Sequence, residues 1–343
     1  MQTTSRFLVA ATLAASVSAC GNYSLYGQPD HGVGFTAMTQ DLGVGGDLEA
    51  VLAAPPASQP ALADALWAQK DTASFAKRVE AIADGIKLRS PDFVGVQSAM
   101  QWHVTTPGSS TETLASDYLD LLVAALTARG LAYAPVATLT TADLTLTGAS
   151  GNVYRATDRE AILVRAGVAT LESTSGTFGA QRTVSIGGTA VPYLRGWVAV
   201  RLQISGKAFR VLSTHLDSVD PATERAQATE LVSVANPGPA LVMGDLGADA
   251  SDPAWAGYAV MTALPTGLSD AVALAGAAFP TCCRDDACVD PSAKLGRRND
   301  VILVSPEFLP WTGVTVNGAT SPMVDGLWPS PHAGVVGSMA LMQ

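Results

Sequence analysis

The stretch Ser330-Pro331-His332-Ala333-Gly334-Val335-Val336, near the end of the chain, decides how the fold is interpreted. Three upstream segments carry further acid and base groups beside apolar runs: Thr214-His215-Leu216, Gly244-Asp245-Leu246-Gly247 and Arg298-Asn299-Asp300-Val301. Each polar residue alone also fits a structural role. His215 would pack in the core, Asp245 would close a turn or cap a helix, Asp300 would pair with a neighbouring arginine, and His332 would lie in a loop. Their order and spacing carry the argument.

In that order and spacing, the four segments resemble the endonuclease/exonuclease/phosphatase superfamily, the DNase I-like metal-dependent phosphoesterases. The resemblance implies a four-layer α/β/β/α sandwich, in which two packed sheets are covered by helices on the outside. Hydrophobic periodicity by itself indicates only a mixed α/β fold.

The resemblance also implies a role for each of the four residues. Asp245 stands where the family's aspartate orients the attacking water. His332 takes the place of the catalytic histidine, Asp300 that of its aspartate partner, and His215 that of a second histidine that contacts phosphate. A hydrogen bond from aspartate to histidine fixes the tautomer of the ring, so His332 is expected to act as a base or as a donor to a phosphoryl oxygen.

Several positions depart from the family pattern. Ser98 replaces the metal-holding glutamate, Gly247 the phosphate-binding asparagine, and Pro331 the aspartate before the last histidine. The family's first strand ends in asparagine, whereas here Gln40 is followed by Asp41. Because Mg²⁺ is usually held by one or two carboxylates plus water, the loss at position 98 is expected to weaken metal binding. Asp41 is a candidate metal ligand that would compensate.

Two hypotheses for function follow. The first is an exported, membrane-tethered phosphoesterase that uses Mg²⁺ or another divalent cation to hydrolyse a phosphodiester or phosphomonoester. Its substrate would be a small phosphate ester, such as a sugar phosphate, or a phospholipid headgroup. The second is a pseudoenzyme that serves as an envelope binding module. The retained aspartates and histidines favour the metal-dependent hydrolase, and the losses at Ser98, Gly247 and Pro331 favour the pseudoenzyme.

Composition and charge limit the remaining function classes. The chain has 343 residues, 48% of them hydrophobic and 15% charged, which is enough to bury a large core, and we expect a single domain over residues 33–343. The formal charge of −10 repels phosphate polyanions, and no run of lysine or arginine offsets it. Bulk nucleic acid is therefore disfavoured as a partner, and an extracellular nuclease is the weaker alternative.

The amino terminus predicts an exported protein. Arg6 precedes an apolar run over residues 7–17, and small residues lead to Cys20, as in the lipobox of bacterial lipoproteins. We expect residues 1–20 to be the signal peptide, 21–32 a tether, and Cys20 the lipidated residue. Gly21 favours the outer membrane of a two-membrane bacterium. An ordinary secretory signal cleaved near Ala19 is the alternative.

The other three cysteines lie close together, at Cys282, Cys283 and Cys288. Disulfides persist in exported proteins, so one bridge is expected. A bridge between adjacent cysteines would need a strained ring, and we therefore expect Cys288 to pair with Cys282 or Cys283. A metal site of these three sulfurs is a weaker alternative, because no histidine is near in sequence.

Hydrophobic periodicity, together with capping residues and prolines, predicts the following helices, loops and strands. Helices are expected over residues 74–89, 118–129 and 221–234, the last capped by Asp220 with Pro221 in its first turn. Residues 53–61 are expected to form a loop because they contain three prolines, and residues 170–189 a mobile insert or hairpin. Strands are expected over residues 35–39, 93–97, 132–139, 160–165, 196–204, 207–214, 240–243, 301–304, 312–316 and 335–341.

Overall fold

The computed structural model describes residues 33–263, 267–317 and 323–342. Its first sheet has eight strands in the order β15-β16-β1-β2-β6-β3-β4, with β5 also paired to β6. Their bounds are β1 (Val33–Asp41), β2 (Phe93–Gln97), β3 (Gln101–Thr105), β4 (Thr113–Asp117), β5 (Tyr133–Thr147), β6 (Val153–Arg165), β15 (Phe308–Asn317) and β16 (Gly334–Leu341).

The second sheet has six strands in the order β13-β14-β12-β11-β10-β7, and β8 and β9 form a separate hairpin. The bounds are β7 (Ala169–Thr177), β8 (Arg182–Ile186), β9 (Thr189–Tyr193), β10 (Gly196–Ile204), β11 (Lys207–His215), β12 (Ala240–Asp245), β13 (Ser269–Asp270) and β14 (Asp300–Val304). The helices are α1 (Leu48–Ala53), α2 (Gln59–Ala73), α3 (Phe75–Arg89), α4 (Tyr118–Ala128), α5 (Pro221–Ala235), α6 (Gly257–Thr262) and α7 (Ala271–Leu274).

The two sheets pack face to face around a core of aromatic rings. Phe35 and Phe93 from the first sheet meet Phe209 from the second, and the Phe35 and Phe209 rings stack with centroids 4.7 Å apart. Such contacts remove large apolar surfaces from water and hold the sheets together. The strand residues that alternate with this core face outward to the helices.

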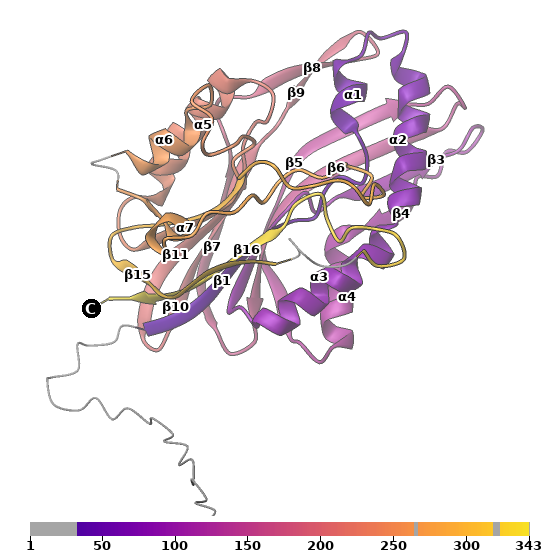
Figure 1. The fold of residues 1–343 in the computed structure, drawn as a ribbon. Coiled ribbons are helices and arrows are strands. Elements are labelled where there is room, and N and C mark those ends of the chain that lie inside the picture. The colour runs from indigo at the N-terminus through magenta and orange to yellow at the C-terminus, as the bar shows by residue number, and fades with distance from the viewer. Residues whose placement is uncertain (1–32, 264–266, 318–322, 343) are drawn as a thin grey trace, which may run out of the picture.

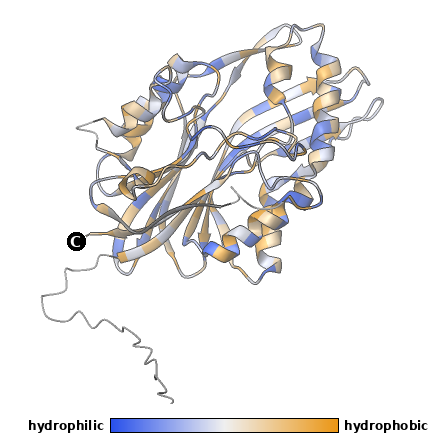
Figure 2. Ribbon diagram, viewed as in Figure 1, coloured by the Kyte–Doolittle hydropathy of each residue, from blue (hydrophilic) through white to orange (hydrophobic). Residues whose placement is uncertain are grey.

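Helices cover the outer faces of both sheets. On the first sheet, Leu66 of α2, Ile82 of α3 and Leu122 of α4 belong to one buried cluster. On the second, Leu231 of α5 and Met261 of α6 belong to another. Figure 1 shows α5 and α6 on one side of the sheets and α2, α3 and α4 on the other, and hydrophobic and hydrophilic residues are mixed along these helices in Figure 2. The predicted α/β/β/α sandwich is confirmed.

Most expected elements are present, with longer strands than predicted. The hairpin between β10 and β11 turns at Ser205 and Gly206, which both have positive φ angles of 47° and 81°. Helix α5 starts as predicted, because the Asp220 side chain accepts hydrogen bonds from the backbone N–H groups of Ala222 and Thr223.

The loop predicted over residues 53–61 was wrong in part, and the hairpin predicted within residues 170–189 was confirmed only in part. Residues 59–61, expected in a loop, begin α2, because Pro60 lies in the first turn, where a missing N–H group removes no helical hydrogen bond. Residues 170–189 form most of β7, all of β8 and the first residue of β9. Only part of this segment is a hairpin, since β7 is an edge strand paired with β10.

The predicted signal peptide at 1–20, with Cys20, and the tether at 21–32 lie outside the described residues. Within the parts of the chain that the structure describes, no helix is both long and apolar enough to span a bilayer.

Candidate active site

Strand register brings three of the predicted residues side by side. Strand β11 pairs in parallel with β12 so that His215 lies opposite Asp245. Strand β12 pairs antiparallel with β14 so that Asp245 lies opposite Asp300. All three residues stand at one end of the second sheet, although 85 positions separate His215 from Asp300 in the sequence (300 − 215 = 85).

The first sheet contributes Asp41 and His332 to the same place. Asp41 is the last residue of β1, and His332 lies just before β16, the antiparallel neighbour of β1. Ser330 fixes this corner, because its hydroxyl donates to the Asp41 carbonyl at 2.7 Å and accepts from the His332 backbone N–H at 3.1 Å. Residues from both sheets therefore meet in one cleft.

His332 is held by carboxylates. Its Nδ1 lies 2.9 Å from Asp300 Oδ2 and 3.5 Å from Asp245 Oδ2. Burial alone would lower the pKa of His332, but the carboxylates of Asp300, Asp245 and Asp41 outweigh it and raise that pKa well above its ordinary value. The ring is therefore protonated near neutral pH and offers a hydrogen-bond donor.

His215 has the opposite character. Its Nδ1 lies 3.5 Å from Asp41 Oδ2 and its Nε2 lies 3.7 Å from Asp245 Oδ2, while Arg195 Nη2 is 3.3 Å from Nε2. Burial, reinforced by the cations of Arg195 and His332, lowers the pKa of His215 well below its ordinary value. This ring is neutral near pH 7, and its lone pair lies at Nε2, where it accepts a hydrogen bond from Arg195.

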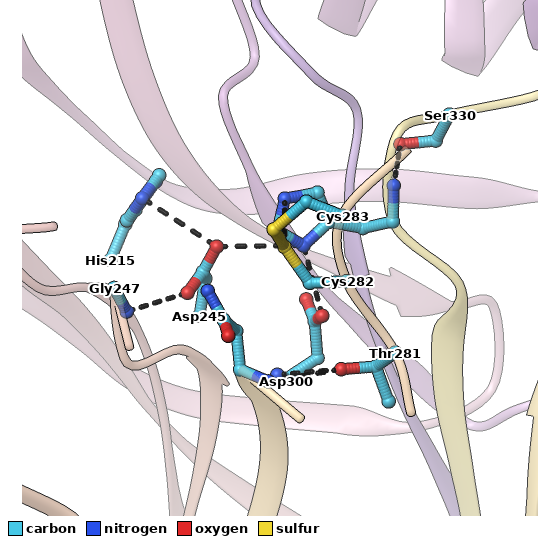
Figure 3. Close-up of a disulfide and its surroundings, with 10 residues drawn as sticks. His215, Asp245, Gly247, Thr281, Cys282, Cys283, Asp300 and Ser330 are labelled. Carbon is cyan, nitrogen blue, oxygen red and sulfur yellow. Dashed lines mark hydrogen bonds and ion pairs between the residues drawn. A yellow bond between two sulfur atoms is a disulfide. The ribbon is translucent and has the colours of Figure 1, made fainter. Parts of the chain in front are cut away.

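Asp245 lies between His215 and the Cys282–Cys283 disulfide (Figure 3). Its Oδ1 accepts the backbone N–H of Gly247 at 2.6 Å, which leaves Oδ2 between the two histidines. Burial raises the pKa of Asp245 and of Asp300. Both carboxyl groups are therefore better proton acceptors than in water.

Asp41 and Ser98 form a pair. The Ser98 hydroxyl donates to Asp41 Oδ2 at 2.8 Å, and the backbone N–H of Gly43 donates to Oδ1 at 2.6 Å. Asp41 is 1% exposed, and burial raises its pKa. The carboxylate at this end of the first sheet is therefore that of Asp41 in β1, and the small side chain of Ser98 leaves space beside it.

A cavity of about 340 Å³ opens over these residues. It is lined by residues of both sheets and of the loop before β14, among them Asp41, Ser98, Tyr193, Arg195, His215, Asp245, Gly247, Cys283, Arg297 and His332. A cavity of this size suits one small ligand.

The predicted disulfide was wrong. Cys282 is bonded to Cys283, and Cys288 is buried without a disulfide among the described residues. Cys288 instead closes a turn on the Asp285 carbonyl, and its own carbonyl accepts the backbone N–H of Trp328 at 2.8 Å. The sulfur of Cys282 lies 3.5 Å from His332 Nε2, so the bridge forms part of the wall beside His332.

Solved structures share this fold over nearly their whole length. An endonuclease/exonuclease/phosphatase from Bacteroides vulgatus is 16% identical, with a TM-score of 0.56 over 90% of this chain and 99% of that chain. The protein has the endonuclease/exonuclease/phosphatase fold. D. rerio TDP2 complexed with a single-strand DNA product is 16% identical, with a TM-score of 0.54 over 89% of this chain and 98% of that chain.

A mannosyl-6-phosphatase from Bacteroides thetaiotaomicron is 15% identical, with a TM-score of 0.52 over 89% of this chain and 99% of that chain. No protein-family model and no curated protein matches the sequence. The chain is therefore a divergent example of the endonuclease/exonuclease/phosphatase fold.

The departures from the pattern of this fold have local physical causes. Gly247 has a φ of +75°, and a Cβ atom there would lie 2.4 Å from the Asp217 carbonyl oxygen, so this backbone excludes an asparagine. Pro331 packs its ring on Gly43, where an added Cβ would lie 2.5 Å from the proline Cδ. Gly247 and Pro331 both line the pocket, so these two departures change its shape.

Sequence reasoning missed three buried charged residues, Arg195 in the wall of the pocket and Asp158 and Glu160 behind it. Asp158 and Glu160 point inward from β6, and Arg195 immediately precedes β10. The signal was present in the sequence, because Asp158 and Glu160 alternate just before the apolar run 161–164, on the strand face that continues with the buried Ile162.

Proposed function

We propose that the protein is a divalent-metal-dependent phosphoesterase that hydrolyses a small phosphate ester in this pocket, with one domain over residues 33–343 carrying the activity. The observation that supports it most is that Asp41, His215, Asp245 and His332 line one cavity, with Asp300 bonded to His332. The neighbours of the same fold include a phosphatase, which supports the reaction class.

The charges of the pocket floor fit a bound cation. Asp41 and Asp245 line the pocket, and Asp158, Glu160 and Asp300 are buried behind it, so five carboxyl groups surround the two cationic groups Arg195 and His332 in this part of the described structure. Asp41, His215 and Asp245 each offer a ligand atom within 4.8 Å of the others. Two carboxylates completed by water suit Mg²⁺, so Asp41 and Asp245 would hold the ion.

A divalent cation bound there supplies a Lewis acid that polarises a phosphoryl oxygen and offsets its developing charge. The protein's own groups do the remaining work. Asp245 accepts a hydrogen bond from water and orients it, helped by its raised pKa. His332, protonated and fixed by Asp300, donates a hydrogen bond to the phosphoryl or leaving-group oxygen.

The substrate that this site favours is a small phosphate ester, either a sugar phosphate or a phospholipid headgroup. The cavity is small, and the formal charge of −10 disfavours a polyanion such as bulk nucleic acid. A nuclease therefore fits less well than a phosphatase or a headgroup phosphodiesterase.

The test is hydrolysis of bis(p-nitrophenyl) phosphate, a hexose 6-phosphate and a short-chain phospholipid, each with Mg²⁺, Mn²⁺ or EDTA. His332→Ala is expected to lower kcat by about 10²- to 10⁴-fold, the usual contribution of a positioned acid or base. His103→Ala, a histidine of β3 that does not line the pocket, is the matched control and should keep the full rate. Rates that do not depend on the cation would contradict the metal-dependent mechanism. No hydrolysis above background, or equal rates for wild type and His332→Ala, would overturn the proposal and support the pseudoenzyme suggested by Ser98 and Gly247.

We propose in addition that the protein is exported and anchored by lipid on Cys20, in the outer membrane of a two-membrane bacterium. Support comes from the sequence alone, from Arg6, the apolar run 7–17 and the small residues before Cys20. Expression with a radiolabelled fatty acid should label the wild-type protein and not Cys20→Ala. Label on both, or on neither, would refute the anchor.

A further inference from the structure

Asn299 is a buried amide whose polar atoms are free. The residue is 4% exposed and lines the cavity, yet its Oδ1 is completely enclosed and has no hydrogen-bond partner among the described residues. Its Nδ2 also lacks a partner within the described chain, but this atom is not fully enclosed. Because buried polar groups are nearly always hydrogen-bonded, a free amide in the wall of a cavity indicates a ligand.

The backbone holds this amide in a fixed position. The N–H group of Asn299 donates to Thr281 Oγ1 at 3.2 Å, and its carbonyl accepts the N–H of Leu246 at 3.0 Å. Leu246 directly follows Asp245, so Asn299 lies at the end of the strand pair that carries the acid groups of the site. Since the main chain is bonded on both sides, the side chain is positioned before a ligand arrives.

Arg297 adds a cation to the same wall of the cavity. It stands two residues before Asn299, in the segment that leads into β14, and both side chains line the cavity. Of the two arginines that line this cavity in the described structure, Arg195 is paired with Asp158, whereas Arg297 makes no ion pair. The guanidinium of Arg297 is exposed and is therefore available to an anion at the mouth of the pocket.

We propose that Asn299 and Arg297 bind a phosphoryl group in the pocket. Asn299 Nδ2 donates a hydrogen bond to a phosphoryl oxygen, and the Arg297 guanidinium attracts the anion from the mouth. The part that this phosphoryl group plays as substrate rests on the proposed function, whereas its binding does not.

The other walls leave a place for these donors. The carboxyl groups of the floor repel an anion, and Gly247 has no side chain that could donate. The Arg195 guanidinium is already engaged by Asp158 and His215. A phosphoryl group presents several strong acceptor oxygens, so the donor on His332 satisfies only part of it.

The experiment is titration of the full chain with inorganic phosphate by calorimetry in the presence of Mg²⁺, with Asn299→Leu as the main variant. Leucine is close to asparagine in size but has no polar side-chain atoms. Because a hydrogen bond to a charged group is lost, phosphate affinity should fall about 10- to 100-fold. Urea unfolding without phosphate should show no loss of stability, since the substitution also removes the unpaired Oδ1.

Asn152→Leu is the matched control. Asn152 lies outside the pocket, and its Nδ2 donates to Ser150 Oγ at 3.1 Å and to Tyr154 Oη at 3.2 Å. This variant should lose stability and keep the wild-type affinity for phosphate, which is the reverse of the result expected for Asn299→Leu. Arg297→Gln should weaken phosphate binding about fivefold at low salt and less at high salt, because this side chain is exposed.

The outcomes separate this inference from the proposed function. Weaker phosphate binding by Asn299→Leu, with stability retained, supports the inference even if no ester is hydrolysed. Wild-type affinity in both Asn299→Leu and a second variant, Asn299→Asp, would overturn it, as would a wild-type protein that binds no phosphate. A clear loss of stability in Asn299→Leu would mean that the amide serves the fold and would also count against the inference.

Discussion

Replacing Asp41 with asparagine tests whether this carboxylate holds the pocket cation. The asparagine keeps the shape and one oxygen, which can still accept the Gly43 N–H, but it removes the charge. It also matches the residue that ends the first strand in the family pattern, without returning a glutamate at Ser98. The variant then has no carboxylate at position 41 or at position 98.

The size of the effect follows from linkage between binding and folding. Changing a residue behind a metal ligand typically weakens affinity 10- to 100-fold, so removing a ligand should cost about 100-fold or more. At a Mg²⁺ concentration of 100 times the wild-type Kd, binding stabilises the folded protein by about 2.7 kcal/mol. After a 100-fold loss of affinity, the same concentration contributes only about 0.4 kcal/mol. The Mg²⁺ increment should therefore fall by about 2.3 kcal/mol.

The assay is urea unfolding followed by tryptophan fluorescence, with Mg²⁺ and with EDTA. Asp270→Asn is the matched control, because Asp270 is buried outside the pocket, where it caps α7 and pairs with Arg298. This control is expected to lower the baseline stability but to keep the Mg²⁺ increment. An Asp41→Asn protein that retains the wild-type increment would refute the assignment of Asp41 as a ligand.

Three further predictions concern stability and pH. Gly247→Asn should lower the free energy of unfolding by about 1–3 kcal/mol in urea titrations, because its Cβ meets the Asp217 carbonyl; no loss would contradict the steric argument. Burial raises the pKa of Glu224 to about 7, so ionisation of this group lowers the stability of wild type as the pH rises from about 4.5 to 7. Glu224→Gln should therefore be more stable than wild type by about 1–2 kcal/mol at pH 8 but not at pH 4. An equal gain in stability at both pH values would disprove this. Asp300→Asn removes a carboxylate charge that raises the pKa of His332, so kcat/KM should begin to fall at a lower pH than in wild type as the pH rises. An alkaline limb at an unchanged pH would count against a protonated His332.

Local sequence signals predicted ten of the sixteen strands and three of the seven helices within the described residues. Strands such as β10 and β11 have a short turn between them and an apolar face, which local propensity and burial both favour. The α2 helix was missed because Pro60 reads as a breaker unless its position in the first turn is known. The pairing of Cys282 with Cys283 depends on the conformation of the loop before β14, which backbone hydrogen bonds between Cys282 and Arg297 hold in place. No local sequence pattern predicts that conformation.

The sequence predicted the site residues at strand ends but not the buried acids of β6. Residues at strand ends, such as His215 and Asp245, follow apolar runs, and the order of their motifs shows that they belong together. Asp158 and Glu160 were missed because charged residues that alternate along a strand usually face water. Only the pairing of β6 with β2 and the approach of the second sheet reveal that this face is covered. Tertiary packing, which periodicity does not encode, determines this part of the site.

The central claim is that the pocket binds a divalent cation through Asp41 and Asp245. Its most direct test is anomalous diffraction from crystals soaked in Mn²⁺. The account predicts an anomalous peak within bonding distance of both carboxylates, about 2 Å from their oxygens. The absence of any peak in contact with Asp41 or Asp245 at a saturating Mn²⁺ concentration would contradict it.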